Sequence, residues 1–135
     1  MVQEVKQHNR QIATVLGLAG IAVIHILDLP GKFAEAPYLA FGYIGIIVAA
    51  GIIIERLLTG KRTVDYLMSS VLSVAVLIGF VINRTVGMPG ATGDIGNWLE
   101  PLGFLSLFVE IWAVWQSIAG YQALKALKDQ SSLSR

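Results

Sequence analysis

The chain contains no cysteine, and only 14% of its 135 residues are charged. The lack of cysteine excludes disulfides, thiolate metal ligands and cysteine nucleophiles. A soluble domain carries charge on about a quarter of its residues, so the low charge argues against a water-exposed surface over most of the chain. The formal net charge is only +1, which does not match the strongly basic surface of a nucleic-acid-binding protein. No nucleic-acid partner is therefore expected.

Apolar residues make up 55% of the chain and are gathered into four long blocks. The blocks cover residues 11–29, 38–58, 64–82 and 99–121. Each has about 20 residues, the length of a helix that crosses a hydrocarbon core of about 30 Å. Backbone polar groups in lipid must be satisfied within their own segment, so each block is expected to be helical. The sequence predicts an all-α fold, a four-transmembrane-helix bundle that forms one membrane domain over residues 1–135.

The connections between the blocks predict the orientation of the bundle. Two of them, residues 30–37 and 83–98, are expected to form outer loops, and residues 59–63 an inner loop. Of the ten basic residues, only Lys32 and Arg84 fall on the predicted outer side. Basic residues are enriched on the cytoplasmic side of membrane proteins. Both termini are therefore expected to be cytoplasmic.

One acidic residue, Glu110, falls in the middle of the fourth block. It lies ten residues after Glu100, which corresponds to a depth of about 15 Å. A charged side chain there costs at least about 2.5–3.5 kcal/mol, and no Lys or Arg is expected at matching depth. We therefore expect Glu110 to be neutral and hydrogen-bonded to a backbone carbonyl, a hydroxyl or Tyr43. Because ionisable residues inside membranes are often functional, Glu110 is the functional candidate within the spans.

The fourth block has two different faces. Small and polar residues recur every three or four positions, which is typical of a helix face packed against other helices: Gly103, Ser106, Glu110, Ala113, Ser117 and Gly120. A bulky second face is expected to meet lipid or a partner protein: Phe104, Phe108, Trp112 and Trp115. Small residues that would match the first face occur in the other blocks: Gly17, Gly20, Gly42, Gly45, Ser69 and Ser73. Glu110 is therefore expected to point into the bundle.

A polar cluster is predicted at the outer ends of the spans, formed by His25, Asp28, Arg84 and Glu100. His25 and Asp28 are three residues apart on one helical face, where the carboxylate can orient the imidazole. Arg84 is expected to pair with Asp28 or Glu100 and to hold the helix ends together. A structural ion-pair cluster is the preferred interpretation, and no cofactor is predicted. If a divalent metal binds, its ligands would be His25, Asp28 and Glu100.

Two stretches, NRTVGMPG at residues 83–90 and HILDLP at residues 25–30, resemble segments of small uncharacterised four-span integral membrane proteins of bacteria. The resemblance implies a multi-pass protein of the bacterial cytoplasmic (inner) membrane. It implies no activity, because no established function is associated with that group.

Two functional hypotheses follow. The leading one is a non-enzymatic accessory or structural subunit, or a partner-binding protein, since no catalytic set is recognisable. Its partners would be the lipid bilayer, other membrane subunits or further copies of the chain. The alternative is an oligomeric protein that binds or transports a small molecule or a metal, with Glu110 as the proton-coupling group. The alternative requires a cavity that reaches Glu110 from one side, whereas tight packing around Glu110 would argue against it.

Overall fold

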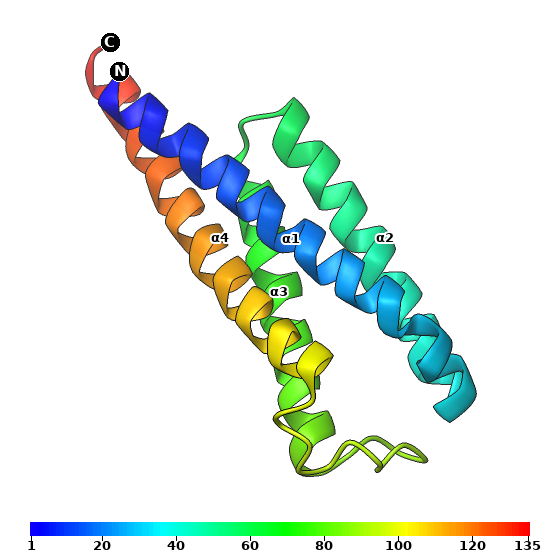
Figure 1. The fold of residues 1–135 in the computed structure, drawn as a ribbon. Helices are drawn as coiled ribbons and strands as arrows, with labels where there is room; N and C mark the ends of the chain where they lie inside the picture. The colour runs from blue at the N-terminus through cyan, green and yellow to red at the C-terminus, as the bar shows by residue number, and fades with distance from the viewer.

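The computed structural model describes residues 1–135 and consists of four α-helices (Figure 1). They are α1 (Val2–Glu35), α2 (Pro37–Thr59), α3 (Thr63–Thr85) and α4 (Pro101–Leu133). All four are long and apolar enough to cross a membrane. The predicted all-α bundle of four membrane-spanning helices is thus confirmed.

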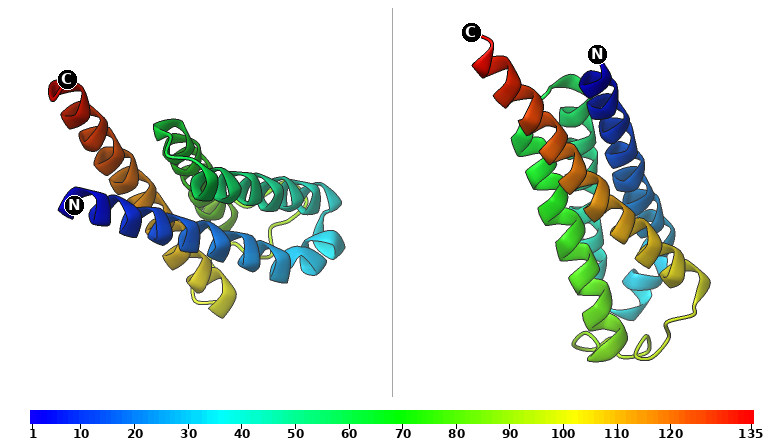
Figure 2. Two further views of the ribbon diagram at one scale, coloured as in Figure 1. Left: turned by 90° about the horizontal axis from the view of Figure 1, so that it is seen from above. Right: turned by 90° about the vertical axis from the view of Figure 1, so that its left-hand side faces the viewer.

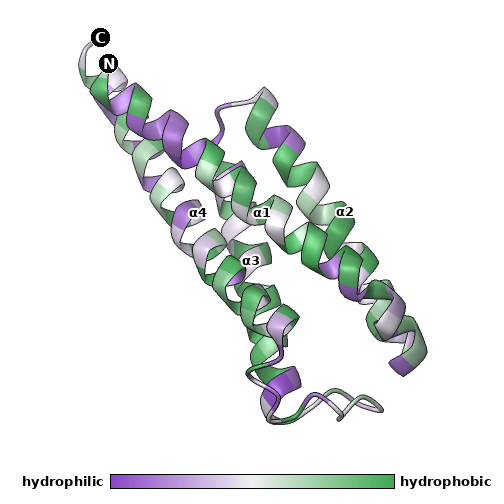
Figure 3. Ribbon diagram, in the orientation of Figure 1, coloured by the Kyte–Doolittle hydropathy of each residue, from purple (hydrophilic) through white to green (hydrophobic).

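The two outermost helices in the sequence are longer than the apolar blocks. α1 has 34 residues and α4 has 33, or about 50 Å each, against about 35 Å for α2 and α3. Their extra turns project past the α2–α3 connection, and both chain termini lie at that end (Figure 1). The first turns of α1 are mostly hydrophilic, whereas the middles of the helices are mostly hydrophobic (Figure 3). We call this end the terminal end, and the opposite end, with residues 86–100, the loop end.

The first predicted outer loop is shorter in the structure than the sequence suggests. Instead of a loop over residues 30–37, α1 continues through Pro30, and only Ala36 separates it from α2. Pro30 and the glycine after it read as a turn signal. On α1, however, Lys32 is within 3.9 Å of the Asp28 carboxylate one turn earlier, and such pairs stabilise a helix. The second predicted loop, 83–98, corresponds to residues 86–100.

The helices do not pack equally against one another. α1 packs against α2 and α4, and α3 packs mainly against α4, whereas no Cα atom of α2 lies within 8 Å of one of α4. α2 and α3 are joined at the terminal end and diverge toward the loop end (Figures 1 and 2). The separation between α2 and α3 is therefore greater in the loop half than at the terminal end.

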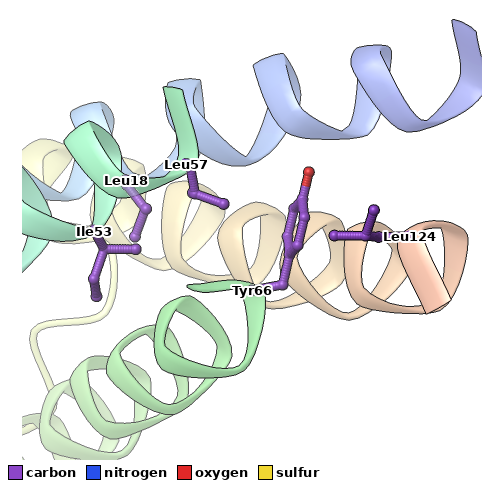
Figure 4. Packing of buried hydrophobic residues seen from close by; sticks show 5 residues of the cluster. All are labelled: Leu18, Ile53, Leu57, Tyr66 and Leu124. Atoms are coloured by element: carbon purple, nitrogen blue, oxygen red, sulfur yellow. The ribbon is translucent and has the colours of Figure 1, made fainter. Parts of the chain in front are cut away.

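The main hydrophobic core lies in the terminal half. It contains five buried side chains from all four helices: Leu18, Ile53, Leu57, Tyr66 and Leu124 (Figure 4). The Tyr66 hydroxyl points toward α1, where it accepts a hydrogen bond from Gln7 at 3.2 Å. A smaller cluster of Ile21, Val76 and Ala113 continues the core toward the middle of the bundle.

Small residues allow α1 and α4 to approach closely. A Cβ atom added at Gly17 would lie 3.0 Å from the Ala113 Cα atom, and one at Gly20 would lie 2.7 Å from Val109. All six residues of the small, polar face of α4 are buried, as predicted. The expectation for α2 is wrong, because Gly42 and Gly45 have no heavy atom within 4 Å of an added Cβ and so do not pack against another helix.

Candidate functional site

A cavity of about 440 Å³ occupies the loop half of the bundle, where α2 and α3 diverge. All four helices and the segment 86–100 contribute to its wall, which is mainly apolar. Ile24, Ile46, Leu72, Val76 and Phe80 are among its hydrophobic residues. Six charged residues also line it: Asp28, Lys32, Arg84, Asp94, Glu100 and Glu110.

Glu110 forms the deep end of this cavity. Its position as the tenth residue of α4 places it about 14 Å from the start of the helix, and the residue is only 1% exposed. Its Oε1 atom accepts a hydrogen bond of 2.5 Å from the Ser106 hydroxyl, one turn earlier on α4. Its Oε2 atom is buried and has no hydrogen-bond partner. The inward orientation and the hydroxyl partner expected from the sequence are both present, and one carboxylate oxygen has no hydrogen-bond partner.

His25 lies on the α1 wall of the cavity, but Asp28 does not orient it. The His25 Nδ1 atom lies 2.7 Å from the Ile21 carbonyl oxygen. Because a carbonyl only accepts, Nδ1 carries a proton, and in the neutral imidazole Nε2 carries the lone pair. Asp28 instead accepts a hydrogen bond of 3.0 Å from the Tyr43 hydroxyl of α2. The Tyr43 ring packs against the His25 ring with 4.5 Å between their centres.

Two basic residues organise the loop end of the cavity. Arg84 contacts Asp94 at 3.0 Å and Glu100 at 3.1 Å, so the pairing with Glu100 is as expected, whereas the one with Asp28 is not formed. Lys32 contacts Asp94 at 2.9 Å and Glu35 at 2.7 Å. Asp94 thus bridges α1 and α3, a role that the sequence did not reveal, because Lys32 and Asp94 are 62 residues apart.

Glu100 has a second role as the N-cap of α4. Its side chain accepts hydrogen bonds from the backbone N–H groups of Leu102 at 3.2 Å and Gly103 at 2.9 Å. Acidic side chains at this position satisfy free N–H groups and interact favourably with the helix dipole. The N-cap therefore positions the same carboxylate that binds Arg84.

The charges around Asp94 are well matched. Burial alone would raise the pKa of Asp94. Hydrogen bonds from Lys32 and Asn83, together with the charges of Lys32 and Arg84, outweigh burial and hold this pKa below its ordinary value. Asp94 is therefore a stable anionic anchor for its loop.

The segment 86–100 runs across the loop end of the bundle (Figures 1 and 2), and Met88, Asp94 and Glu100 of this segment line the cavity. It is attached to α1 through the contact between Asp94 and Lys32. It is attached to α2 through the Tyr38 hydroxyl, which donates a 2.7 Å hydrogen bond to the Pro89 carbonyl. Gly87, at φ 83°, adopts a backbone conformation that side-chain-bearing residues disfavour. These contacts make the segment an ordered cover rather than a free loop.

The predicted metal ligands are not gathered into one coordination site. No group of three or more His, Cys, Asp or Glu side chains is arranged to hold a metal ion. Asp28 faces Tyr43 and Lys32, whereas Glu100 binds Arg84 and the start of α4. Of the three predicted metal ligands, only His25 is not paired with another side chain, and one nitrogen atom does not make a metal site.

The aromatic face of α4 is only partly as expected. Phe104, Phe108 and Trp115 are 59%, 65% and 58% exposed, as a lipid-facing or partner-binding surface requires. Trp112 departs from this pattern, because it packs against α1 and donates a hydrogen bond of 3.0 Å to the Ala13 carbonyl. Close approach at Gly17, whose added Cβ would lie 3.0 Å from the Trp112 ring, draws this side chain inward.

Comparisons of the chain with protein-family models, with curated proteins and with solved structures gave no match.

Proposed function

We propose that this protein is a non-enzymatic, small-molecule-binding protein of the bacterial cytoplasmic membrane. Its ligand would occupy the cavity between His25 and Glu110. One observation supports this above all others: Glu110 lines the cavity, and one of its carboxylate oxygens is buried without a partner within the bundle.

The dimensions and chemistry of the cavity match those of ligand sites. Such sites measure about 300–1,000 Å³, are mostly apolar and contain a few convergent polar groups. The cavity has a volume of about 440 Å³ and combines apolar side chains with His25, Ser106 and Glu110. This is the feature that the small-molecule hypothesis requires and that tight packing around Glu110 would have contradicted.

The glycines of the cavity wall also favour a binding role. Gly42 on α2 and Gly79 on α3 both line the cavity, and neither has a heavy atom within 4 Å of an added Cβ. Unfilled space in a bundle lowers its stability, because the lining atoms lose contacts. A purely structural subunit would gain by filling this space, whereas a binding protein needs it.

The charge distribution supports one orientation of the binding protein. Both termini lie at the terminal end together with the α2–α3 connection, and eight of the ten basic residues belong to these segments. By the enrichment of basic residues on the cytoplasmic side, the terminal end would be cytoplasmic. The covered end of the cavity would then face outward.

A second candidate function is that of a subunit in a larger membrane assembly. It is favoured by the exposed aromatic side chains of α4, Phe104, Phe108 and Trp115, which would supply contact area to a partner helix. Homo-oligomers would use the same surface. This role is compatible with ligand binding, since these side chains point away from the cavity wall.

Native mass spectrometry of protein extracted mildly from its own membrane tests the proposal. We expect a bound small molecule of defined mass on the wild-type protein. The variants Gly42→Leu and Gly79→Leu, which fill the cavity, should lose it. The control Gly45→Leu, three residues from Gly42 and equally free of neighbours but outside the cavity wall, should keep it.

The same spectra distinguish the two candidates. A defined complex with other membrane proteins and no bound small molecule would favour the subunit role. A wild-type protein without any bound molecule, or equal retention in all three leucine variants, would contradict the binding proposal.

A further inference from the structure

We infer that the cavity selects a hydrophobic organic cation, with one ammonium-type centre on an apolar body, and that Glu110 holds the positive charge. This inference rests on the proposed function and specifies the ligand class of the same site. Three features of the cavity support it: its charge balance, the hydrogen-bonding state of its deep end and its apolar wall.

The charge balance of the cavity is negative. Four acidic residues line it, Asp28, Asp94, Glu100 and Glu110, against two cations, Lys32 and Arg84. The balance is negative even with Glu110 neutral in the empty cavity, and a bound cation would favour the ionised form of Glu110. Both cations are already engaged by carboxylates at the loop end. No ion pair reaches Glu110, which leaves its acidic group without a basic partner in the protein. An anionic ligand would be repelled by this arrangement, and a cation would complete it.

Three hydrogen-bond donors of the cavity wall, those of Ser106, His25 and Tyr43, are committed to acceptors within the protein. The Ser106 hydroxyl donates to Glu110 Oε1 itself. On α1, His25 donates through Nδ1 to a backbone carbonyl, and on α2, Tyr43 donates to Asp28. Glu110 Oε2 and His25 Nε2 therefore remain without a hydrogen-bond partner among these side chains. A ligand that fits must bring the positive charge or the donor itself.

The remaining wall accommodates an apolar body. On α3 the lining residues at mid-depth are Leu72, Ala75 and Val76, so this helix adds no charge opposite Glu110. The Tyr43 ring lies between Asp28 and His25, where an aromatic face can contact a cation. The combination of one acidic group with an extended apolar wall matches an amine or quaternary ammonium that carries a hydrocarbon group.

The position of the cavity explains how such a ligand would arrive. The ion pairs of Lys32, Arg84 and Asp94 hold segment 86–100 over the loop end. In contrast, Gly42 on α2 and Ala75 on α3 are cavity-lining residues that are also exposed at the side of the bundle. Access is therefore lateral, from the bilayer, where hydrophobic cations accumulate.

Radioligand binding to the full-length protein in detergent micelles tests the inference, with empty micelles as background. The probe is tritiated benzyltrimethylammonium, and the competitors are its neutral isostere neopentylbenzene and the anion phenylacetate. We expect saturable binding that unlabelled probe displaces and that neither competitor affects at the same concentration.

Two variants test whether Glu110 is the residue that binds the positive charge of the ligand. Glu110→Gln keeps an oxygen that accepts from Ser106 but removes the charge, and should weaken binding about thirtyfold or more, as expected for the loss of one partner of a buried charge pair. Glu55→Gln makes the same change at an exposed position on α2 and should bind like the wild type. Thermal unfolding of both variants verifies that they are folded. If Glu110→Gln does not fold, the cavity-filling variant Gly79→Leu takes its place and should abolish binding.

Each contrary result has a distinct meaning. Equal binding by Glu110→Gln would overturn the role of Glu110. Equal competition by neopentylbenzene, with loss of binding in Gly79→Leu, would overturn the selection for cations but leave the binding function intact. No saturable binding to the wild type would overturn the ligand class, while the mass-spectrometric experiment would still decide the binding function independently.

Discussion

The contact between Tyr66 of α3 and Gly120 of α4 provides a stringent test of the packing in the terminal half. The residue Tyr66 is 1% exposed, and its ring lies directly against the glycine. A Cβ atom added at Gly120 would overlap the ring, with Cδ1 at 2.6 Å and Cζ at 2.9 Å. The variant Gly120→Ala therefore cannot be accommodated unless the ring or one of the two helices moves.

The ring has little freedom to move. Leu57 and Leu124 lie on either side of it (Figure 4), Leu18 and Ile53 belong to the same buried cluster, and its hydroxyl is held by Gln7. Overpacking a filled core costs about 1–3 kcal/mol, and the enclosure of Tyr66 places the expected loss at about 2–3 kcal/mol. The control Gly51→Ala makes the same chemical change at a site with no heavy atom within 4 Å and should leave stability unchanged or raise it by up to about 1 kcal/mol, because alanine favours a helix more than glycine does.

Reversible unfolding by sodium dodecyl sulfate in mixed micelles measures both variants. A double-mutant cycle with Tyr66→Leu then isolates the collision, because the smaller side chain makes room for the alanine. We expect the two substitutions together to cost at least about 1 kcal/mol less than the sum of their separate effects. Equal stability of Gly120→Ala and Gly51→Ala, or strict additivity in the cycle, would refute the close packing described here.

Three further predictions concern polar contacts. Asp65→Asn should destabilise the bundle by about 1–3 kcal/mol in the same unfolding assay, because it leaves Arg56 without its carboxylate partner at 2.7 Å. The double variant that also carries Arg56→Met should lose less stability than Asp65→Asn alone. An equal or greater loss of stability in the double variant would contradict this reasoning. The depressed pKa of Asp94 means that its ion pairs contribute stability above its unfolded pKa of about 4, and that this contribution disappears as the pH falls through the lower folded value. The hydrogen-exchange protection of residues 86–100, taken relative to the intrinsic exchange rate at each pH, should therefore fall on acidification in the wild type but not in Asp94→Asn. An identical pH profile of protection for both would count against the anchor. Trp112→Phe should cost about 0.5–1.5 kcal/mol through the lost hydrogen bond to α1, and wild-type stability would show that this bond contributes nothing.

The two halves of the bundle have different physical roles. The terminal half contains the main hydrophobic cluster and a 2.6 Å hydrogen bond between the hydroxyls of Ser69 and Ser117, both of which hold the helices together. The loop half contains the cavity and is held together mainly by ion pairs at its edge. Stability in one half allows unfilled space in the other, which is the arrangement that a binding protein needs.

Several features of the fold were predictable because they depend on local sequence. The four membrane-spanning helices follow from the length of the apolar blocks and the need to satisfy backbone polar groups in lipid. The buried face of α4, including Ser106 and Glu110, follows from helical periodicity. Glu110 could be identified as a candidate site residue because a carboxylate in the middle of an apolar helix requires a compensating interaction.

Partner choice was less predictable, because spacing along one helix does not reveal what the other helices present. His25 and Asp28 share a helical face, yet the carboxylate binds Tyr43 and the imidazole binds its own backbone. Lys32 lies in a stretch that resembles a turn, and its partner Asp94 comes from a distant loop. Both pairings arise only when α1, α2 and segment 86–100 meet at the loop end.

The sequence by itself determined the membrane location of the helices, their number and the inward face of α4, because hydropathy and helical periodicity are properties of each segment. The tertiary structure alone decided that α2 and α3 diverge and that Gly42 and Gly79 have no neighbouring heavy atom within 4 Å of an added Cβ. It also decided that one oxygen of Glu110 is buried without a hydrogen-bond partner. A cavity is the space that several helices leave between them. Its existence therefore depends on their relative positions, which no single segment encodes.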